Sequence, residues 1–290
     1  MNTASEVQEV KLVGVIGGGN IGSTLVVDLL LHHIPVVLVD VSEEILLTIK
    51  EKLQRELMLA PMMNKKITPI DLNEIDNLLV LTTDLEKVSD CDLIIENVPE
   101  EWPIKKELYP KLDSICKPEA CFGVNTSCIP IGKIAALTNR PKKIVGVHFM
   151  NPVYLKDTVE VIQGKATSYQ TISVLQSLLQ MLHKDAVLVN DNPGFVSNRI
   201  SHLFMNEAAF VFQDEVADAV AIDKIFRNCF NHNMGPLETA DLIGIDTVVK
   251  SIDVLYDNFK DPKFKCCPLL REMVAAGKLG RKTGEGFYKY

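Results

Sequence analysis

The chain has 290 residues, enough to bury a large hydrophobic core and to divide into two domains. Hydrophobic residues make up 47% of it and charged residues 23%, a balance typical of globular proteins that excludes intrinsic disorder. The net charge of −8 disfavours nucleic acid and anionic membranes as partners. No apolar stretch reaches the roughly 18–20 residues of a transmembrane helix, and the first residues lack the pattern of a secretory signal.

The seven cysteines indicate free thiols rather than disulfides. Their number is odd, and they form neither a C-x-x-C pair nor a Cys/His cluster with the spacing of a zinc site. Reduced thiols are typical of the cytoplasm. We therefore expect a cytoplasmic protein that holds no metal.

The first predicted strand, Lys11–Ile16, leads into a glycine-rich turn that is typical of dinucleotide binding. The turn reads Gly-Gly-Gly-Asn-Ile-Gly and fits the pattern G-x-G-x-x-G. Gly17 allows the tight turn, Gly19 lets backbone N–H groups approach a pyrophosphate, and Gly22 lets helix and strand pack closely. The helix predicted over Asn20–His32 then presents its positive N-terminal end to the phosphates.

An acidic residue, Asp40, follows the next predicted strand, Val36–Val39. It lies about 20 residues beyond the glycines, where a carboxylate accepts hydrogen bonds from the ribose hydroxyls of NAD. The same carboxylate would repel the 2′-phosphate of NADP. The order of strand, glycines, helix, strand and acid therefore predicts NAD as the cofactor. The residues of this unit that we expect to bind it are Gly17, Gly19, Asn20, Ile21, Gly22 and Asp40.

Strands and helices continue to alternate up to about residue 190, which predicts a parallel doubly wound sheet with right-handed crossovers. A long helix or helical hairpin over Glu44–Met63 forms an insert after the second strand. The later strands are expected at Leu78–Leu81, Leu93–Ile95, Ala120–Val124, Lys143–Val147, Thr158–Ile162 and Ala186–Val189. Helices are expected between them at Ile104–Ile115, Ile131–Leu137 and Ile172–Leu182.

The breaker Asp191-Asn192-Pro193-Gly194 marks a domain boundary. Beyond it strand patterns nearly vanish and helical periodicity dominates. The expected helices are Val196–Phe212, Ala219–Cys229, Asp246–Phe259 and Leu269–Ala276. The sequence therefore predicts an α/β, Rossmann-type doubly wound domain over residues 1–190 and an all-helical domain over 191–290.

Polar side chains follow the predicted strands at their carboxyl ends, where the active site of an open α/β sheet lies. Asn125 and Ser127 come after one strand, and His148 comes after the next. Glu160 lies within the strand that follows. Asn198 lies at the head of the first helix of the second domain. These positions are the candidates for the chemistry.

These residues and the motifs around them resemble the L-3-hydroxyacyl-CoA dehydrogenase family, which includes bacterial 3-hydroxybutyryl-CoA dehydrogenases. The resemblance covers nearly the whole chain. Besides the glycine turn, the motifs that carry it are Val36-Val37-Leu38-Val39-Asp40, Asn125-Thr126-Ser127, Val147-His148-Phe149-Met150-Asn151-Pro152, Val159-Glu160-Val161, Pro193-Gly194-Phe195 with Asn198-Arg199, Met234-Gly235-Pro236-Leu237 and Gly280-Arg281-Lys282-Thr283-Gly284-Glu285-Gly286-Phe287-Tyr288. The resemblance implies NAD-dependent oxidation of a 3-hydroxyacyl thioester in a cleft between the two domains, and a homodimer formed by the helical domain.

The resemblance also implies a catalytic His–Glu pair. His148 would take the proton of the secondary alcohol, since imidazole titrates near neutrality, and such a base raises the rate about 10²–10⁴-fold. Glu160 would orient the imidazole and stabilise its charged form. Ser127 and Asn198 would hydrogen-bond the reacting oxygen or the neighbouring carbonyl. The further cofactor contacts that the family implies fall on Glu100, Lys105, Asn125, Asn151 and Lys282.

The chain departs from the family in ways that bear on the substrate. Fatty-acid members hold the phosphorylated adenosine of CoA on a lysine-rich insert, whereas here Glu56 and Met63 stand where the family offers a serine and a lysine. Lys65 and Lys66 lie nearby and would compensate in part. The polar segment Tyr154-Leu155-Lys156-Asp157-Thr158 replaces a more apolar one. These changes favour a short, polar acyl group on an acyl carrier protein, as in polyketide extender-unit pathways, as the alternative to CoA.

Two other functions are compatible with the sequence. A sugar-acid or carnitine-type dehydrogenase of the same superfamily is favoured by Val98-Pro99-Glu100, Ser127-Cys128 and Gly235-Pro236-Leu237-Glu238-Thr239. Against it, Asn125-Thr126 and His148-Phe149 resemble the hydroxyacyl branch. A non-catalytic NAD-binding protein is the alternative of another class, and it is disfavoured because both members of the expected His–Glu pair are present.

Overall fold

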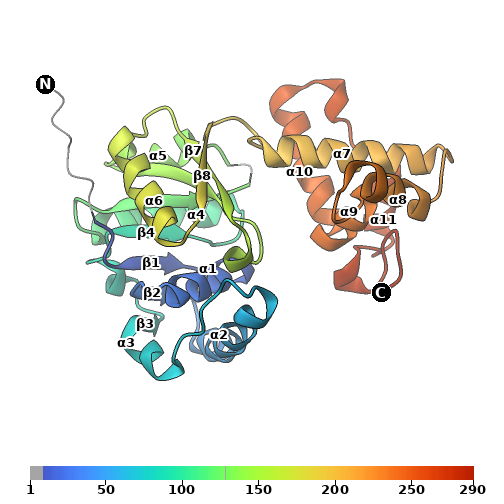
Figure 1. Ribbon diagram of the computed structural model, residues 1–290. Helices are drawn as coiled ribbons and strands as arrows, with labels where there is room; N and C mark the ends of the chain where they lie inside the picture. Colours follow the sequence, from blue (N-terminus) through green and yellow to red (C-terminus); the bar gives the residue numbers. More distant parts are fainter. Residues whose placement is uncertain (1–8, 128) are drawn as a thin grey trace, which may run out of the picture. The chain divides into compact units, whose positions relative to one another are not determined.

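The computed structural model describes residues 9–127 and 129–290, which form two compact units. The first unit ends at Asp191 and the second runs from Asn192 to Tyr290. Strands and helices alternate in the first unit, whereas helices build the second (Figure 1). No helix in the described part of the chain is both long and apolar enough to span a membrane.

The first unit is built on an eight-stranded sheet in the order β3-β2-β1-β4-β5-β6-β7-β8. The central strands β1, β2 and β4 are short, mostly apolar and buried along their whole length, as expected where helices cover both faces of a sheet. The strands are β1 (Val13–Ile16), β2 (Val36–Val39), β3 (Leu79–Thr82), β4 (Leu93–Glu96), β5 (Cys121–Asn125), β6 (Ile144–His148), β7 (Thr158–Gln163) and β8 (Asp185–Asn190).

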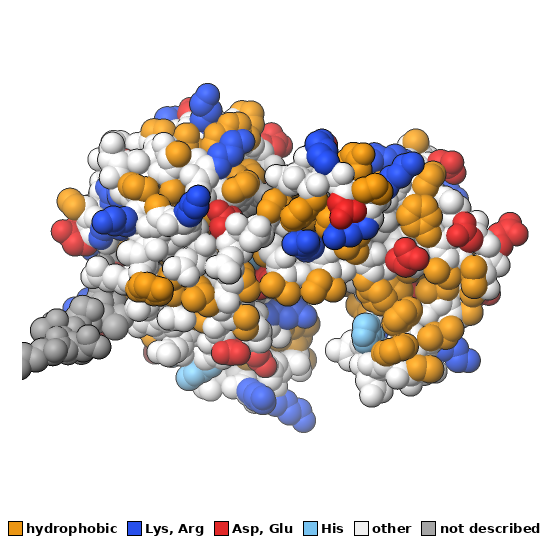
Figure 2. All heavy atoms as spheres, turned by 90° about the horizontal axis from the view of Figure 1, so that it is seen from above, with side chains coloured by type: hydrophobic (Ala, Val, Ile, Leu, Met, Phe, Trp, Pro, Cys, Tyr) orange, Lys and Arg blue, Asp and Glu red, His pale blue; other side chains and the backbone are white. Residues whose placement is uncertain are grey.

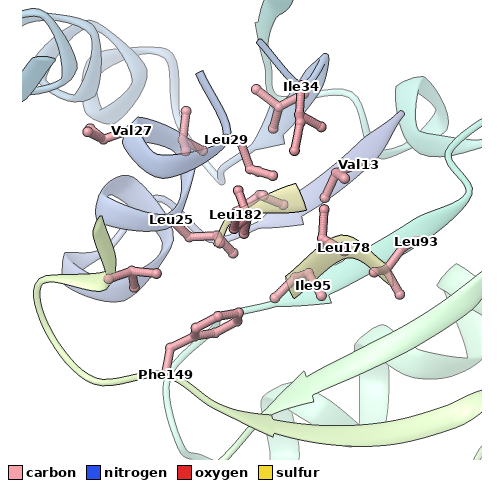
Figure 3. Close-up of a cluster of buried hydrophobic side chains, with 14 of the residues drawn as sticks. Val13, Leu25, Val27, Leu29, Ile34, Leu93, Ile95, Phe149, Leu178 and Leu182 are labelled. Carbon is pink, nitrogen blue, oxygen red and sulfur yellow. The ribbon is translucent and has the colours of Figure 1, made fainter. Parts of the chain in front are cut away.

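Helices cover the sheet on both faces. On one face, side chains of α1 and α6 join those of β1 and β4 in a single buried cluster, to which the ring of Phe149 also belongs (Figure 3). On the other face, Tyr109 of α4 packs against Phe122 of β5, with ring centroids 6.4 Å apart. The helices of this unit are α1 (Asn20–Leu31), α2 (Glu43–Met63), α3 (Ile75–Leu78), α4 (Trp102–Ile115), α5 (Ile131–Ala135) and α6 (Tyr169–Met181).

The insert after β2 is the single long helix α2, not a helical hairpin. Ser42 caps its start, because the side chain accepts a hydrogen bond from the backbone N–H of Ile45 at 3.2 Å. Glu43 and Glu44 lie in the first turn, where negative charge is favourable beside the positive end of the helix. The helix therefore begins where local capping chemistry predicts.

The expectation of an all-parallel sheet is wrong at one pair, because β7 runs antiparallel to β6. The connection between them holds only the single turn η4 (Val153–Leu155), which is too short for the crossover helix that parallel neighbours require. After α6, β8 is again parallel to β7. The reversal places His148 directly opposite Glu160 in the strand register.

The second unit is all-helical. Its core is formed by apolar side chains such as Met205, Ile252 and Leu270. The helix α9 is missing from the sequence-based expectation, because Gly235 and Gly244 at its two ends resemble the glycines of an ordinary loop. The helices are α7 (Ser197–Gln213), α8 (Ala219–Phe230), α9 (Pro236–Ile243), α10 (Ile245–Phe259) and α11 (Pro268–Ala275).

Two buried carboxylates hold the C-terminal segment within this helical unit. Asp241 of α9 accepts hydrogen bonds from the backbone N–H groups of Phe287 and Tyr288, each at 2.9 Å. Asp223 of α8 accepts the hydroxyl of Tyr288 at 2.7 Å. Burial raises the pKa of Asp241, and the neighbouring charge of Asp223 acts in the same direction.

Candidate active site

The glycines of the turn after β1 are required for different physical reasons. Gly17 has a φ of +91°, and a Cβ there would lie 2.9 Å from the carbonyl oxygen of Asn97. A Cβ at Gly22 would lie 1.9 Å from the carbonyl oxygen of Gly17, so the packing of helix on strand itself requires glycine. At Gly19, by contrast, no described atom lies within 4 Å of that position. This open space fits the expected approach of a cofactor phosphate.

Asp40 lies directly after β2 with its carboxylate against the same turn. Its Oδ2 accepts the backbone N–H of Gly18 at 2.6 Å, and its Oδ1 accepts that of Val41 at 2.7 Å. Nζ of Lys52 on α2 lies 3.4 Å from Oδ1 of Asn20, at the start of α1. A pocket of about 350 Å³ adjoins the turn and is lined by Gly18, Gly19, Asn20, Glu44, Ile45, Thr48, Ile49 and Lys52.

These features fit a dinucleotide. The start of α1, where Asn20 and Ile21 lie, offers backbone N–H groups and the positive end of a helix to phosphate. Asp40 offers a carboxylate for ribose hydroxyls, and Lys52 adds a cation beside the turn. The structure therefore brings together all the residues that the sequence predicts for this part of the cofactor site.

His148 ends β6 and is held at both of its ring nitrogens. Its side chain is buried, with the residue only 5% exposed. Nδ1 lies 2.9 Å from Oε2 of Glu160, and Nε2 lies 3.3 Å from the hydroxyl oxygen of Ser127. A carboxylate at Nδ1 favours the tautomer in which Nε2 carries the lone pair. The structure thus forms a candidate general base from three of the four expected catalytic residues.

The fourth expected catalytic residue, Asn198, lies in the first turn of α7 in the helical unit. Its backbone carbonyl oxygen lies 2.9 Å from Nδ1 of His202, one turn further along the helix. The role of its side chain in catalysis stays a prediction.

Glu100 holds the loop that carries Ser127. Its Oε1 accepts the backbone N–H groups of Ser127 and Ile129, each at 3.1 Å, and also the hydroxyl of Thr126. Cys128, which follows Ser127, lies outside the described residues. Glu100 therefore shapes the site whether or not it also touches the cofactor, and that contact stays a prediction.

Lys105 lies on helix α4, but its side chain is buried and does not reach solvent. Its side chain is 0% exposed. Nζ donates to both oxygens of Glu96, at 3.0 and 2.8 Å, and to the carbonyl oxygen of Asn125 at 3.0 Å. The ammonium group thus makes these hydrogen bonds inside the protein, and its contact with the cofactor stays a prediction.

Asn97 is a site residue that the sequence analysis missed. It lies directly after β4, beside the glycine turn, and its Oδ1 accepts Nδ2–H of Asn125 at 2.8 Å. Oδ1 of Asn125 in turn accepts the backbone N–H of Phe149 at 3.4 Å. A chain of amides therefore joins the carboxyl ends of β4, β5 and β6. The sequence did contain a signal for Asn97, because it is a polar residue directly after a buried strand. The same signal identified Asn125 as a candidate.

The two remaining expected cofactor residues lie in different units. Asn151 is exposed, in the connection between β6 and β7. Lys282 forms an ion pair with Asp246 within the helical unit. Their contacts with the cofactor stay predictions.

Comparison with known proteins identifies the family. The model of the NAD-binding domain of 3-hydroxyacyl-CoA dehydrogenase matches residues 12–192, and that of its C-terminal domain matches residues 194–290. A probable 3-hydroxybutyryl-CoA dehydrogenase of Bacillus subtilis is 39% identical over 282 residues, which cover 97% of this chain and 98% of that protein. A 3-hydroxybutyryl-CoA dehydrogenase of Bradyrhizobium diazoefficiens is 38% identical, covering 97% and 96%.

Solved structures agree. The (S)-3-hydroxybutyryl-CoA dehydrogenase PaaH1 from Ralstonia eutropha is 35% identical, with a TM-score of 0.92 and coverage of 97% of this chain and 99% of that one. These findings confirm the predicted Rossmann-type fold with its helical C-terminal domain, and the predicted NAD cofactor. The chain belongs to the 3-hydroxyacyl-CoA dehydrogenase family of NAD-dependent oxidoreductases, which act on a CH–OH group.

Proposed function

We propose that this chain oxidises the 3-hydroxyl of a short 3-hydroxyacyl thioester to a 3-oxo group, with NAD as the oxidant and His148 as the base. The observation that carries the proposal is the contact of His148 with both Glu160 and Ser127 at the carboxyl end of β6. The names of the relatives support a short acyl group, since several are 3-hydroxybutyryl-CoA dehydrogenases.

The proton of the substrate hydroxyl is removed by the imidazole ring of His148, whose orientation is set by its contacts with Glu160 and Ser127. His148 accepts the alcohol proton at Nε2, because Nδ1 is directed to Glu160. The Glu160 carboxylate stabilises the imidazolium that forms. The hydroxyl of Ser127, which lies 3.3 Å from Nε2, is placed to hydrogen-bond the same substrate oxygen. Bound NAD supplies the acceptor for the hydride that leaves the carbinol carbon.

Replacement of His148 tests the base. His148→Gln keeps a polar side chain but has no nitrogen that titrates near neutrality, so kcat should fall by about 100-fold or more. The dissociation constant of NAD, measured by titration, should stay unchanged. His33→Gln, an exposed histidine beyond α1, is the matched control and should keep full activity. Wild-type turnover in His148→Gln would remove His148 as the base.

We infer a protein carrier as a second candidate for the group that presents the thioester. The two segments that depart from the family pattern contact each other, because the hydroxyl of Tyr154 donates a hydrogen bond to the carboxylate of Glu56. Burial and the Glu56 carboxylate raise the pKa of Tyr154, which keeps this proton on the hydroxyl. A carboxylate at this position disfavours a CoA phosphate. Met62 and Met63 of the same helix are 78% and 60% exposed, and adaptable methionines are typical of protein-binding surfaces.

The carrier is tested by comparing thioesters of one acyl group. If a carrier protein presents the substrate, kcat/KM for the 3-hydroxybutyryl thioester of that protein should exceed kcat/KM for 3-hydroxybutyryl-CoA. Met62→Glu should then lower kcat/KM for the carrier thioester and leave the CoA thioester unaffected. Leu47→Glu, at the exposed opposite end of α2, is the matched control. Faster oxidation of the CoA ester by the wild-type enzyme would contradict this proposal and leave CoA as the carrier.

A sugar-acid or carnitine-type substrate remains an alternative within the superfamily. Membership of the hydroxyacyl family and the geometry around His148 favour a 3-hydroxyacyl thioester instead. Oxidation of L-gulonate or carnitine with a kcat/KM above that for 3-hydroxybutyryl-CoA would favour the alternative. We expect neither compound to be turned over at a comparable rate.

We also propose that the helical unit mediates a homodimer. Large apolar side chains lie on the surface of this unit, among them Val216, Val220, Ile225 and Phe230, and Figure 2 shows apolar side chains spread over its visible face. Burying one such side chain contributes about 1.5–3 kcal/mol. Light scattering should give a dimer for the wild type and a monomer for the double variant Val220→Asp/Phe230→Asp. A dimeric double variant would contradict this placement.

A further inference from the structure

Behind the loop that carries Ser127 lies a buried group of polar side chains with no part in the proposed proton transfer. Glu96 ends β4 and is 1% exposed, while Lys105 and Tyr109, one turn apart on α4, are both 0% exposed. Burying charged groups costs free energy even when they are paired, and apolar side chains of similar volume often pack there as well or better. The presence of a buried ion pair is therefore not explained by stability alone, and the contacts that it makes indicate its role.

Glu96 neutralises the lysine and fixes where its ammonium group lies. Oε1 accepts Nζ of Lys105 at 3.0 Å and the backbone N–H of Val98 at 2.8 Å. Oε2 accepts Nζ of Lys105 at 2.8 Å and the hydroxyl of Tyr109 at 2.8 Å. Both carboxylate oxygens are thus satisfied from two directions, and Lys105 has little freedom to move.

The same ammonium group also reaches the loop beside the base. Nζ of Lys105 donates to the carbonyl oxygen of Asn125, the last residue of β5, at 3.0 Å. It also lies 3.5 Å from Oε2 of Glu100, whose other oxygen accepts the backbone N–H of Ser127. Lys105 therefore holds the segment at its start, through Asn125, and at Ser127, through Glu100. Because the hydroxyl of Ser127 lies 3.3 Å from Nε2 of His148, a shift of this segment changes the contact with the base.

We propose that Lys105 and Glu96 are positioning residues: the pair holds the segment Asn125–Ser127 in place against His148, and Lys105 acts through this segment and not by touching NAD. The inference rests on the proposed function of His148 and Ser127. It differs from the direct cofactor contact that the family resemblance implies for Lys105.

Lys105→Met tests the proposal, because methionine keeps an unbranched apolar stem of similar length and removes the donor. We expect kcat to fall about 10- to 100-fold, since a displacement of about 1 Å at a reacting group costs about 100-fold. The dissociation constant of NAD should change by less than about twofold. Lys106→Met, the same substitution at the exposed neighbouring position of α4, is the matched control and should behave as the wild type.

Lys105→Met leaves the carboxylate of Glu96 buried without its partner, so it reduces stability as well. The double variant Glu96→Gln/Lys105→Met removes both charges and is the second measurement. It should show the same fall in kcat and the same unchanged affinity for NAD. The split between a lowered kcat and an unchanged dissociation constant of NAD, both measured on the folded variant, is a readout that lost stability does not move.

Two results would overturn the proposal. An NAD dissociation constant raised tenfold or more, with kcat at saturating NAD close to wild type, would show that Lys105 acts by binding the cofactor. An unchanged kcat in the folded double variant would show that the pair serves stability alone. Failure of the proposed function is distinguishable, because it would appear as wild-type turnover in His148→Gln, where Lys105 and Glu96 are intact.

Discussion

At the scale of single residues, the proposed chemistry depends on the two nitrogens of one imidazole ring. Nδ1 of His148 faces the carboxylate of Glu160, and Nε2 faces the hydroxyl of Ser127. The ring is buried, so its attraction to the carboxylate is less screened than it would be in water. In the proposed mechanism, the orientation of the imidazole and the stability of its charged form therefore depend on Glu160.

Replacement of Glu160 should consequently impair catalysis without removing the base. We expect Glu160→Gln to lower kcat by about 100-fold or more, because the amide does not stabilise the imidazolium and permits the other tautomer. The rate of NADH formation at saturating substrates measures the effect. Thr158→Ala, an exposed substitution in the same strand, should leave kcat unchanged. A kcat close to wild type in Glu160→Gln would mean that the carboxylate does not set the ring.

The glycines of the turn allow cofactor binding to be separated from folding. Space is open at Gly19, so Gly19→Val should leave the free energy of unfolding without NAD nearly unchanged while it blocks the cofactor. Gly22→Ala should lower the free energy of unfolding itself, because its Cβ would lie 1.9 Å from a backbone oxygen. Urea unfolding with and without NAD measures both effects. An NAD-dependent stabilisation that survives in Gly19→Val would exclude the expected phosphate approach.

At the scale of elements, the reversed strand β7 brings Glu160 to the proposed base, His148. The connection that turns it back is anchored by Lys184, whose Nζ donates to the carbonyl oxygens of Val153 and Lys156 at 2.8 and 2.7 Å. The same ammonium group lies 2.9 Å from a carboxylate oxygen of Asp28 on α1. This connection therefore rests on α1 on one side and leads into the strand that carries Glu160 on the other.

The C-terminal end of α4 is stabilised by a side chain from another segment. Arg140 donates to the carbonyl oxygens of Cys116 and Lys117 just after the helix, and its Nε lies 2.6 Å from the carboxylate of Asp113. Burial raises the pKa of Asp113, but hydrogen bonds from Asn139 and Arg140 outweigh it, and the net pKa is lowered. A lowered pKa in the folded chain means stability that is present above the unfolded value, about 3.9, and is lost as the pH falls through the folded value.

Asp113→Asn should therefore lower the free energy of unfolding at pH 7 by about 1–3 kcal/mol. The difference from the wild type should shrink as the pH falls through the lowered pKa of Asp113, below which the wild-type carboxyl is itself protonated. Urea titrations at pH 7 and at acid pH measure both values. An equal loss at the two pH values would show that the charge of Asp113 does not contribute.

At the scale of the whole molecule, the chain has a separate core in each of its two units. Leu25 belongs to the buried cluster of the first unit and Leu270 to that of the second, and both are 0% exposed. The division into an NAD-binding and a helical domain gives each core its own elements. The cytoplasmic location expected from the cysteines stays a prediction.

Calorimetry should report the two units separately. NAD at 100 times its dissociation constant should stabilise the first unit by about 2.7 kcal/mol. Leu25→Ala should lower the midpoint of the transition that NAD raises, and Leu270→Ala should lower the other, each by the equivalent of about 2–5 kcal/mol. A single transition that both substitutions and NAD shift together would mean that the units unfold as one.

The parts of the fold that could be predicted from the sequence are those with local causes. The glycine turn and Asp40 were found because turn geometry and phosphate binding impose residue types at fixed spacing. The strands β1 and β2 were found because they are continuous apolar runs between turns. The short helix α9 was missed because its caps, Gly235 and Gly244, resemble the glycines of an ordinary loop.

The sequence by itself determined the dinucleotide unit and the break near Asp191, because the residues that specify each of them lie close together in the chain. The residues of the proposed base came from the resemblance to the family. Only the tertiary structure decided that β7 reverses and brings Glu160 to His148, and that Lys105 lies buried against Glu96. These features depend on which residues meet across the sheet. A single sequence does not contain that information, because pairing between distant segments is fixed by the packing of the whole unit.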